Sequence, residues 1–247
     1  SLGARPDFSG GTYSECGRPY YEYHQIPVDR NKSRYSLAYA NIATHNNFVL
    51  NEGLKVFRET APIITFASDD PAEYFGPLGL LNSSVGCFWL KQTCFPKGGH
   101  GIGRGIQDEA WESRFAFNAA NIDKLPIPAQ EPKSSAERLF NLAKMLGHED
   151  VVSLSASRAI TDAPLRTVIN QQVADWTTTA NNLIRLQEDL DWECYRLYGL
   201  LEDDLTYPTE ESLGIQLGER AFEIVLARKM ARGEVATTWF ERHGSQP

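Results

Sequence analysis

The first half of the chain carries the hydrophobic patterns of short strands and one buried helix. Residues 33–44 and 61–67 are rich in aromatic and β-branched side chains, which is typical of strands. Residues 47–57 predict a β-hairpin whose turn ends at Gly53, because glycine can adopt the positive φ that such a turn needs. Apolar residues at helical spacing over residues 76–94 predict one buried helix.

The pattern becomes helical after a proline-rich boundary. Three prolines fall within residues 126–132, which predicts a linker. Residues 134–137 (SSAE) form a capping-box pattern, so a helix is expected to start there and to end near Gly147. A much longer helix is predicted over residues 162–201, and a last one over about 217–232.

The long helix carries a narrow apolar seam that predicts a partner helix, which is either the helix that starts at residue 134, the last helix or one in a missing part of the protein. Its members are separated alternately by four and three residues, which is the 3.5-residue period of a coiled-coil stripe. We therefore expect a mixed α/β fold, with an N-terminal mixed-sheet domain over residues 1–130 and a long-helix bundle or coiled-coil spacer over residues 131–247. The seam consists of Ile169, Val173, Trp176, Ala180, Leu183, Gln187, Leu190, Cys194, Leu197 and Leu201.

Composition is typical of soluble globular proteins, with 42% hydrophobic and 23% charged residues in 247. The chain has no run of eighteen apolar residues and no export signal, so we expect a cytoplasmic protein without a membrane partner. Its four cysteines contain no CxxC pair, which favours reduced thiols. Because the chain begins at Ser1 and its only methionines are Met145 and Met230, we expect a segment of a larger protein.

Charge is distributed unevenly along the chain. The net charge is −8, which by itself disfavours a nucleic-acid partner, yet residues 131–247 hold 19 acids and 12 bases, against 13 and 12 in residues 1–130. Residues 30–58 and 74–107 form two basic windows. These windows are either ordinary solvated faces or contacts to DNA phosphates.

Two segments within the basic windows carry side chains that can contact DNA. His45 and Asn46 can bond base edges, or they can satisfy backbone groups in a turn. Residues 97–105 (KGGHGIGRG) form either a DNA-following loop or a plain solvent loop. The candidate DNA-binding residues are Lys32, Arg34, His45, Asn46, Lys55, Arg58, Lys91, Lys97, His100 and Arg104.

No catalytic, cofactor-binding or metal-binding constellation is expected in this chain. The glycine-rich segment lacks the Gly-Lys-Ser/Thr ending of a P-loop, and no Asn-Pro-Pro-Tyr-type tetrapeptide for a flipped base occurs. The histidines and cysteines share no metal-ligand spacing. Cys94 and His100 are separated by a flexible stretch that cannot hold a thiolate and its base rigidly. An independent hydrolase or nuclease therefore lacks support.

Six strings of the sequence carry a family resemblance. They are RPYYEYHQI (18–26), ATHNNFVL (43–50), KVFRETAPII (55–64), LGLLNSSVGCFWLKQ (78–92), LQEDLDWECYRLYGL (186–200) and LGERAFEIVLARK (217–229). Together they resemble the C-terminal region of PglX-type adenine-specific DNA methyltransferases of BREX phage-defence systems, which are related to single-chain restriction-modification enzymes.

The resemblance implies a division of labour. Residues 1–130 would be a target recognition domain for double-stranded DNA, and the helices would be the spacer that fixes it to an upstream methyltransferase domain. That domain would use S-adenosylmethionine to methylate adenine N6, and other defence-system subunits are further expected partners. Our leading hypothesis is sequence-specific recognition of DNA for that domain. The alternative is a protein-interaction module that docks another subunit through the helical seam, without direct DNA contact.

Overall fold

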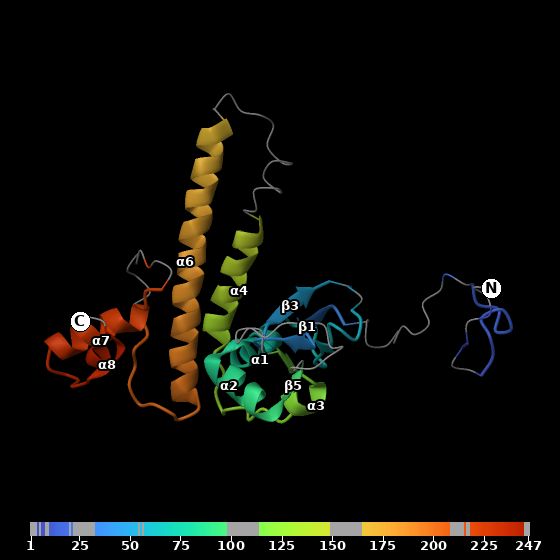
Figure 1. Cartoon of the computed structure of the whole chain (residues 1–247), viewed down its shortest axis with the longest axis horizontal. Coiled ribbons are helices and arrows are strands. Elements are labelled where there is room, and N and C mark those ends of the chain that lie inside the picture. Colours follow the sequence, from blue (N-terminus) through green and yellow to red (C-terminus); the bar gives the residue numbers. More distant parts are fainter. Residues whose placement is uncertain are drawn as a thin grey trace, which may run out of the picture.

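The structure, a computed structural model, combines a small α/β unit with two long upright helices (Figure 1). The helices are α4 (Lys133–His148) and α6 (Leu165–Leu197), and α7 (Ala221–Ala231) and α8 (Trp239–His243) lie on the other side of α6. The predicted mixed α/β fold is confirmed. The structure describes residues 4, 6, 7, 10–19, 21, 33–53, 55, 57–97, 114–148, 165–207, 215 and 218–244.

Two three-stranded sheets make up the strand part of the described chain. The first has the order β3-β1-β4, from β1 (Tyr35–Tyr39), β3 (Phe48–Glu52) and β4 (Ile63–Ile64). The second has the order β2-β6-β5, from β2 (Ile42–Ala43), β5 (Phe95–Lys97) and β6 (Arg114–Ala116). Every strand pairing that the structure describes is antiparallel, which differs from the expected mixed sheet.

The predicted strand over residues 33–44 is in fact two strands that belong to different sheets. The chain turns at Asn41, whose N–H donates to the carbonyl of Thr60 at 3.1 Å. The Asn41 carbonyl accepts from the N–H of Phe117 at 2.8 Å. These bonds replace strand pairing at Asn41, so β1 ends before it and β2 begins after it.

The hairpin predicted within residues 47–57 is wrong. β3 continues through Asn51 and Glu52, where the turn was expected, and pairs with β1. Pairing with β1 buries Leu50 opposite Leu37 in the core, a gain that a local hairpin could not provide. The positive φ predicted for Gly53 is confirmed at +109°, where the residue ends β3.

The single helix predicted over residues 76–94 is broken into α1 (Ala72–Asn82) and α2 (Ser84–Thr93). Ser83 is extended, with ψ of 159°, and its hydroxyl accepts from the N–H of Gly86 at 3.0 Å. Asp191 on α6 accepts from the N–H of Ser84 at 2.7 Å. An N-cap hydroxyl and a carboxylate thus satisfy two N–H groups at the start of α2, which stabilises the break.

α1 approaches α4 and α6 closely at Gly79. A Cβ atom at this position would lie 2.9 Å from Pro132 Cγ, 3.0 Å from Ala136 Cβ and 3.4 Å from Leu190 Cδ1. Ala136 of α4 is buried in the same core as the strands, and α4 also packs against α1. The domain boundary near residue 130 stays a prediction, and side chains on both sides of it share one core.

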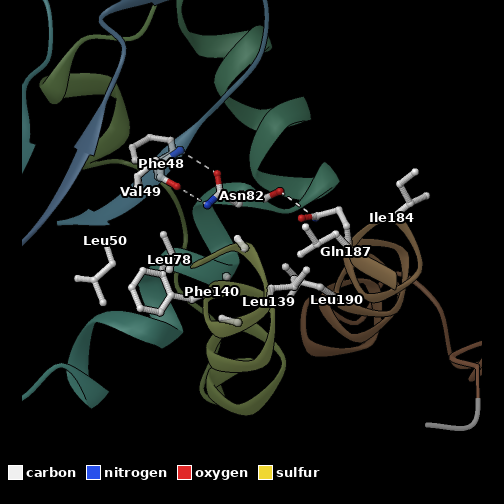
Figure 2. A pocket seen from close by; sticks show the side chains of 14 residues that line it. Phe48, Val49, Leu50, Leu78, Asn82, Leu139, Phe140, Ile184, Gln187 and Leu190 are labelled. Atoms are coloured by element: carbon white, nitrogen blue, oxygen red, sulfur yellow. Dashed lines mark hydrogen bonds between the residues drawn. The ribbon is translucent and has the colours of Figure 1, made fainter. Parts of the chain in front are cut away.

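Asn82 and Gln187 join the sheet, α1 and α6 (Figure 2). The Asn82 side chain donates to the Phe48 carbonyl at 2.8 Å and accepts from the Phe48 N–H at 2.9 Å. Gln187 donates to the Asn82 carbonyl at 3.2 Å. The one polar member of the seam thus satisfies a carbonyl at the end of α1.

The long helix is confirmed, and of the partners that the sequence left open α4 packs against it, but only part of the seam is covered. α4 packs against α6, and Leu190 and Cys194 are buried. Toward the N-terminal end of α6, the side chains of Ile169, Val173 and Trp176 are 38%, 52% and 47% exposed. The predicted start of the helix at residue 162 lies outside the described residues, and its end is at Leu197 rather than at 201.

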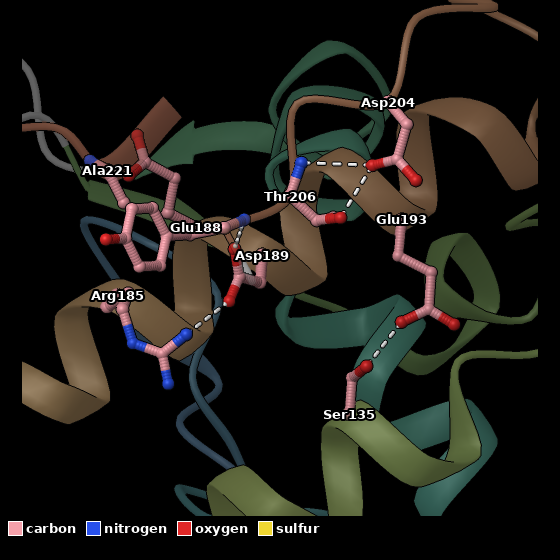
Figure 3. Close-up of polar contacts among 9 residues, drawn as sticks. Ser135, Arg185, Glu188, Asp189, Glu193, Asp204, Thr206 and Ala221 are labelled. Carbon is pink, nitrogen blue, oxygen red and sulfur yellow. Dashed lines mark hydrogen bonds and ion pairs between the residues drawn. The ribbon is translucent and has the colours of Figure 1, made fainter. Parts of the chain in front are cut away.

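The predicted ends of the shorter helices need correction. α4 begins at Lys133, one residue ahead of the SSAE pattern, so Ser134 lies inside the helix and is not its N-cap, and the hydroxyl of Ser135 donates to Glu193 of α6 (Figure 3). α4 also continues through Gly147 to its end at His148. The last predicted helix corresponds to α7, and Gly233 follows its end with a positive φ, as expected. α8 was not predicted.

Carboxylates of α6 hold the C-terminal segment (Figure 3). Glu188 accepts from the N–H of Ala221, the first residue of α7, at 2.7 Å. Asp189 accepts from the N–H of Tyr207 at 2.8 Å. The N-cap residue of α7 makes no side-chain capping bond, so Glu188 of α6, which is remote in sequence, caps this helix instead.

Gly79→Val is expected to lower the free energy of unfolding by about 1–3 kcal/mol, because the added side chain overpacks the contact with Pro132 and Ala136. Urea denaturation measures the change. Ala72→Val is the matched control, since it places the same side chain at an exposed position of α1. Equal stability of the two variants would show that the close approach is not needed.

Asp191→Asn is expected to keep or raise stability at neutral pH, whereas Asp191→Ala lowers it. Burial raises the pKa of the Asp191 carboxyl, even though hydrogen bonds from Ser84 and Gln187 lower it. The folded state therefore holds its proton more tightly, and the free energy of unfolding decreases as pH rises above the ordinary aspartate pKa of about 3.9. Asparagine removes the buried charge and retains an acceptor for Ser84.

Urea denaturation of these variants from acidic to neutral pH provides the measurement. The difference in stability between Asp191→Asn and the wild type should grow as pH rises, because only the wild type acquires the buried charge. A difference that is constant with pH, or an Asp191→Asn variant as unstable as Asp191→Ala, would contradict this account.

Candidate nucleic-acid interface

The second sheet brings apolar and basic side chains onto one face. Ile42 on β2 and Phe95 on β5 both pair with Ala116 of β6, and Lys97 pairs with Arg114 two residues along. Side chains two residues apart in a strand point to the same face. Ile42, Phe95, Lys97 and Arg114 therefore share one face, which we call the aromatic-basic face.

The aromatic-basic face is open to solvent, whereas the opposite face is packed in part. Ala43 and Phe115 point the other way and pack against the main core. On the open face, Phe95 is 72% exposed and Ile42 is 47% exposed, and Lys97 and Arg114 are also exposed. Exposed apolar side chains beside cations suit a ligand that offers both anionic and apolar groups.

The connection that contains most of the glycine-rich segment joins two strands of this face. Residues 98–113 join Lys97, the last residue of β5, to Arg114, the first residue of β6. The segment contains two of the predicted DNA-binding residues, His100 and Arg104, which lie outside the described residues, as does Lys32. A basic residue, Lys97 or Arg114, thus flanks each end of this connection.

Lys91 and Asn46, also predicted to bind DNA, have partners within the fold. The Lys91 ammonium lies 5.7 Å from the centre of the Phe115 ring, a cation–π distance, and the side chain is half-buried. The Asn46 amide donates to the Leu81 carbonyl at 2.5 Å and to the Ser83 carbonyl at 3.4 Å. These contacts fit the alternative in which the two residues support the fold.

The remaining predicted residues lie apart from one another. Arg34 and Lys55 flank the end of the first sheet, where Gly53 donates to the Arg34 carbonyl at 2.9 Å. Arg34 precedes β1, whereas β2 of the second sheet follows the opposite end of β1. Arg34 and Lys55 are therefore not brought together with Lys97. Arg58 pairs loosely with Glu59 at 3.8 Å, and His45 is exposed beyond β2.

Sequence reasoning missed Ile42, Phe95 and Arg114. Arg114 lies outside both basic windows, Ile42 was expected only as part of a strand, and Phe95 falls between the predicted helix over residues 76–94 and the glycine-rich segment. One signal was available: Lys97 and Arg114 bracket the glycine-rich segment, and a long connection between paired strands places its two ends side by side.

The described residues offer no catalytic chemistry that we can identify. An apolar cavity of about 500 Å³ lies between β3, α1, α4 and α6, but its only polar side chains are Asn82 and Gln187 (Figure 2). Burial raises the pKa of the Cys194 thiol to about 12, so it remains protonated at neutral pH. Within the described ranges, no group of three or more His, Cys, Asp or Glu residues is arranged to hold a metal ion.

Among the helices formed by the described residues, none combines the length and the apolar character needed to cross a bilayer.

Comparison with known proteins identifies one relative and one family. Over 256 aligned positions, the chain is 38% identical to the adenine-specific methyltransferase PglX of Streptomyces coelicolor. The chain is similar to a PglX-type C-terminal region. The alignment covers the whole chain and 21% of PglX, so the chain spans about a fifth of that relative's length. The resemblance to PglX predicted from the sequence is thereby confirmed.

Residues 183–247 match the family DUF7008, which is described as a domain of unknown function. This region includes the second half of α6 together with α7 and α8. No solved structure matches the chain. The similarity to PglX thus covers both the aromatic-basic face and the DUF7008 region.

Proposed function

We propose that this chain recognises double-stranded DNA and positions it for the adenine-specific methyltransferase domain of a PglX-type protein. The observation that carries the proposal is the aromatic-basic face, with Lys97 and Arg114 beside the exposed ring of Phe95. The similarity to a protein named adenine-specific methyltransferase supports it. Phage defence by methylation of self DNA at adenine N6 is the biological setting that we propose.

The chemistry of the face fits DNA in two ways. Lys97 and Arg114 can neutralise phosphates and release counterions, which supplies sequence-independent affinity. Phe95 can contact sugars or bases, and apolar side chains inserted between base steps also bend the duplex. Bending helps an enzyme that must extrude an adenine from the stack before it can act on it.

The other predicted basic residues extend the proposed contact beyond the aromatic-basic face. His100 and Arg104 lie on the segment that joins β5 and β6, so we assign base contacts to this segment. Lys32, Arg34, His45, Lys55 and Arg58 are proposed as peripheral phosphate contacts. The acidic second half of the chain would repel DNA and so favour approach to the sheet side.

S-adenosylmethionine, the methyl donor of such an enzyme, does not fit the described residues. A nucleotide-type cofactor commonly binds at a glycine-rich turn from a strand into a helix. β4 leads into α1 through residues 65–71, which contain no glycine, and β6 leads into α3 (Ala119–Ile122) through Phe117 and Asn118. We therefore assign this cofactor to the methyltransferase domain of the larger protein.

Lys97→Ala combined with Arg114→Ala is expected to weaken binding to a duplex of about 30 base pairs by roughly tenfold and to lower the salt slope of log K by about 2, because two phosphate contacts are lost. Fluorescence anisotropy of the 247-residue chain at several salt concentrations measures both quantities. An unchanged slope, or wild-type binding that is absent or insensitive to salt, would refute the proposal.

The matched control removes two exposed arginines far from the face. Arg166 lies near the start of α6 and Arg242 lies on α8, and both side chains are exposed. Arg166→Ala with Arg242→Ala changes the net charge by the same amount as the test pair. It is expected to leave the salt slope unchanged, which separates local contacts from an effect of net charge.

Phe95→Ala is expected to weaken DNA binding by about 1–3 kcal/mol while leaving the salt slope unchanged, because an apolar or stacking contact releases no counterions. The same anisotropy titrations provide the measurement. Phe88→Ala is the control, since this phenylalanine is 68% exposed but lies on α2. If the two variants bind DNA equally well, the role of Phe95 is wrong.

A second candidate function is a protein-interaction module that docks another subunit. The uncovered part of the seam on α6, with Ile169, Val173 and Trp176 exposed, favours it. Salt-dependent DNA binding distinguishes the two functions, since docking through the seam predicts no loss of affinity from changes at Lys97 and Arg114.

A further inference from the structure

A second cavity, of about 520 Å³, lies between α6, α7, α8 and the segment that follows α6. Its lining falls within residues 188–239, inside the DUF7008 region. Aromatic rings form much of its wall. The ring of Trp192 lies 5.3 Å from that of Tyr195 and 5.2 Å from that of Phe222, and the ring of Trp239 lies 5.2 Å from Phe222.

The polar wall of the cavity is short of positive charge. Three carboxylates, from Glu188, Asp191 and Asp203, line it with one guanidinium, from Arg220. Arg220 pairs with Glu188 at 3.1 Å. Neither Asp191 nor Asp203 forms an ion pair with any residue that the structure describes. Asp191 accepts hydrogen bonds from Ser84 and Gln187 through its Oδ1 atom, so its Oδ2 atom and the Asp203 carboxylate remain to attract a further cation.

The cavity already contains one example of the contact that such a cation would make. The Arg220 guanidinium carbon lies 5.5 Å from the centre of the Phe222 ring, so a cation there contacts both an aromatic face and a carboxylate. Trp192 offers a further indole ring, a ring type that attracts cations more strongly than other side-chain rings, whereas one face of Trp239 stacks on His243 at 3.8 Å. A phosphate-bearing ligand would be repelled by the carboxylates.

We propose that this cavity binds a guanidinium or alkylammonium group, supplied by an arginine or lysine side chain of a partner polypeptide or by a free small cation. The carboxylates provide the charge complement and the aromatic rings enclose the alkyl or planar part. Burial raises the pKa of Asp191, and a bound cation would offset that unfavourable desolvation.

The test titrates the 247-residue chain with agmatine and with the peptide acetyl-Gly-Gly-Arg-Gly-Gly-amide. The indole N–H signals of the five tryptophans report the site by NMR, and Trp192→Phe and Trp239→Phe assign the two that line the cavity. Only these two signals are expected to shift and saturate. Tighter binding of the peptide indicates a polypeptide side chain as the ligand, and tighter binding of agmatine indicates a free small cation.

Matched substitutions separate the cavity from general charge. Asp203→Asn is expected to weaken binding of either probe by about threefold to fivefold, because one carboxylate of the lining is lost. Glu202→Gln removes the same charge next to it, outside the lining, and should leave binding unchanged. Both side chains are exposed, so neither change is expected to affect folding.

Three outcomes would overturn the proposal. The first is no shift of the Trp192 and Trp239 signals with either probe up to about 10 mM, well above the affinity expected of a small ligand. The second is equal binding of the peptide with citrulline in place of arginine, since citrulline has the same shape without the charge. The third is tighter binding of uncharged adenosine than of agmatine, which would make the cavity a site for a nucleobase.

Discussion

The whole structure depends on how closely α1 can approach α4 and α6. A glycine stands where the three helices meet, and even one additional carbon would press into Pro132 and Ala136. Because this contact is made without a side chain, Leu190 of α6 can reach the α1 surface and Ala136 of α4 can enter the core beneath the sheet. The α/β unit and the long helix are thereby held in one fixed arrangement.

α6 then serves as the structural reference for both sides of the molecule. Toward the sheet, Gln187 and Asp191 satisfy backbone groups at the break between α1 and α2. Toward the C-terminus, Glu188 and Asp189 do the same for the start of α7 and for Tyr207. Much of the acidity of the second half therefore has a structural role, and two of these carboxylates, Glu188 and Asp191, also line the cavity of the DUF7008 region together with Asp203.

The sequence predicted those features whose causes are local or periodic. The 3.5-residue seam revealed the long helix and its need for a partner, and Gly53 and Gly233 marked the ends of elements through their backbone freedom. The break at Ser83 was missed although the residues Asn82, Ser83 and Ser84 carry a helix-cap signal, because the apolar spacing continues across it. Strand partners were wrong because pairing of β3 with β1 depends on burial in a core that local patterns do not define.

The candidate interface was only half predictable for the same reason. Lys97 was predicted as a basic residue next to glycines. Arg114 and Phe95 could not be predicted from the sequence, because only strand pairing places them on the same face as Lys97. Asn46 looked like a base-reading amide, and only the fold places it against the carbonyls at the end of α1. The type of a side chain limits which groups it can bind, and the tertiary structure decides which of those groups lies next to it.

The antiparallel pairing of Lys97 with Arg114 has a consequence for how recognition can diversify. The two ends of the intervening segment, residues 98–113, are fixed next to each other by the sheet. Changing the length of a connection between fixed ends alters its closure entropy only slowly, by about 0.6 kcal/mol for each doubling. Under the proposed function, replacing residues 98–113 alone could change the DNA contacts, while the paired strands and the helices keep their sequence.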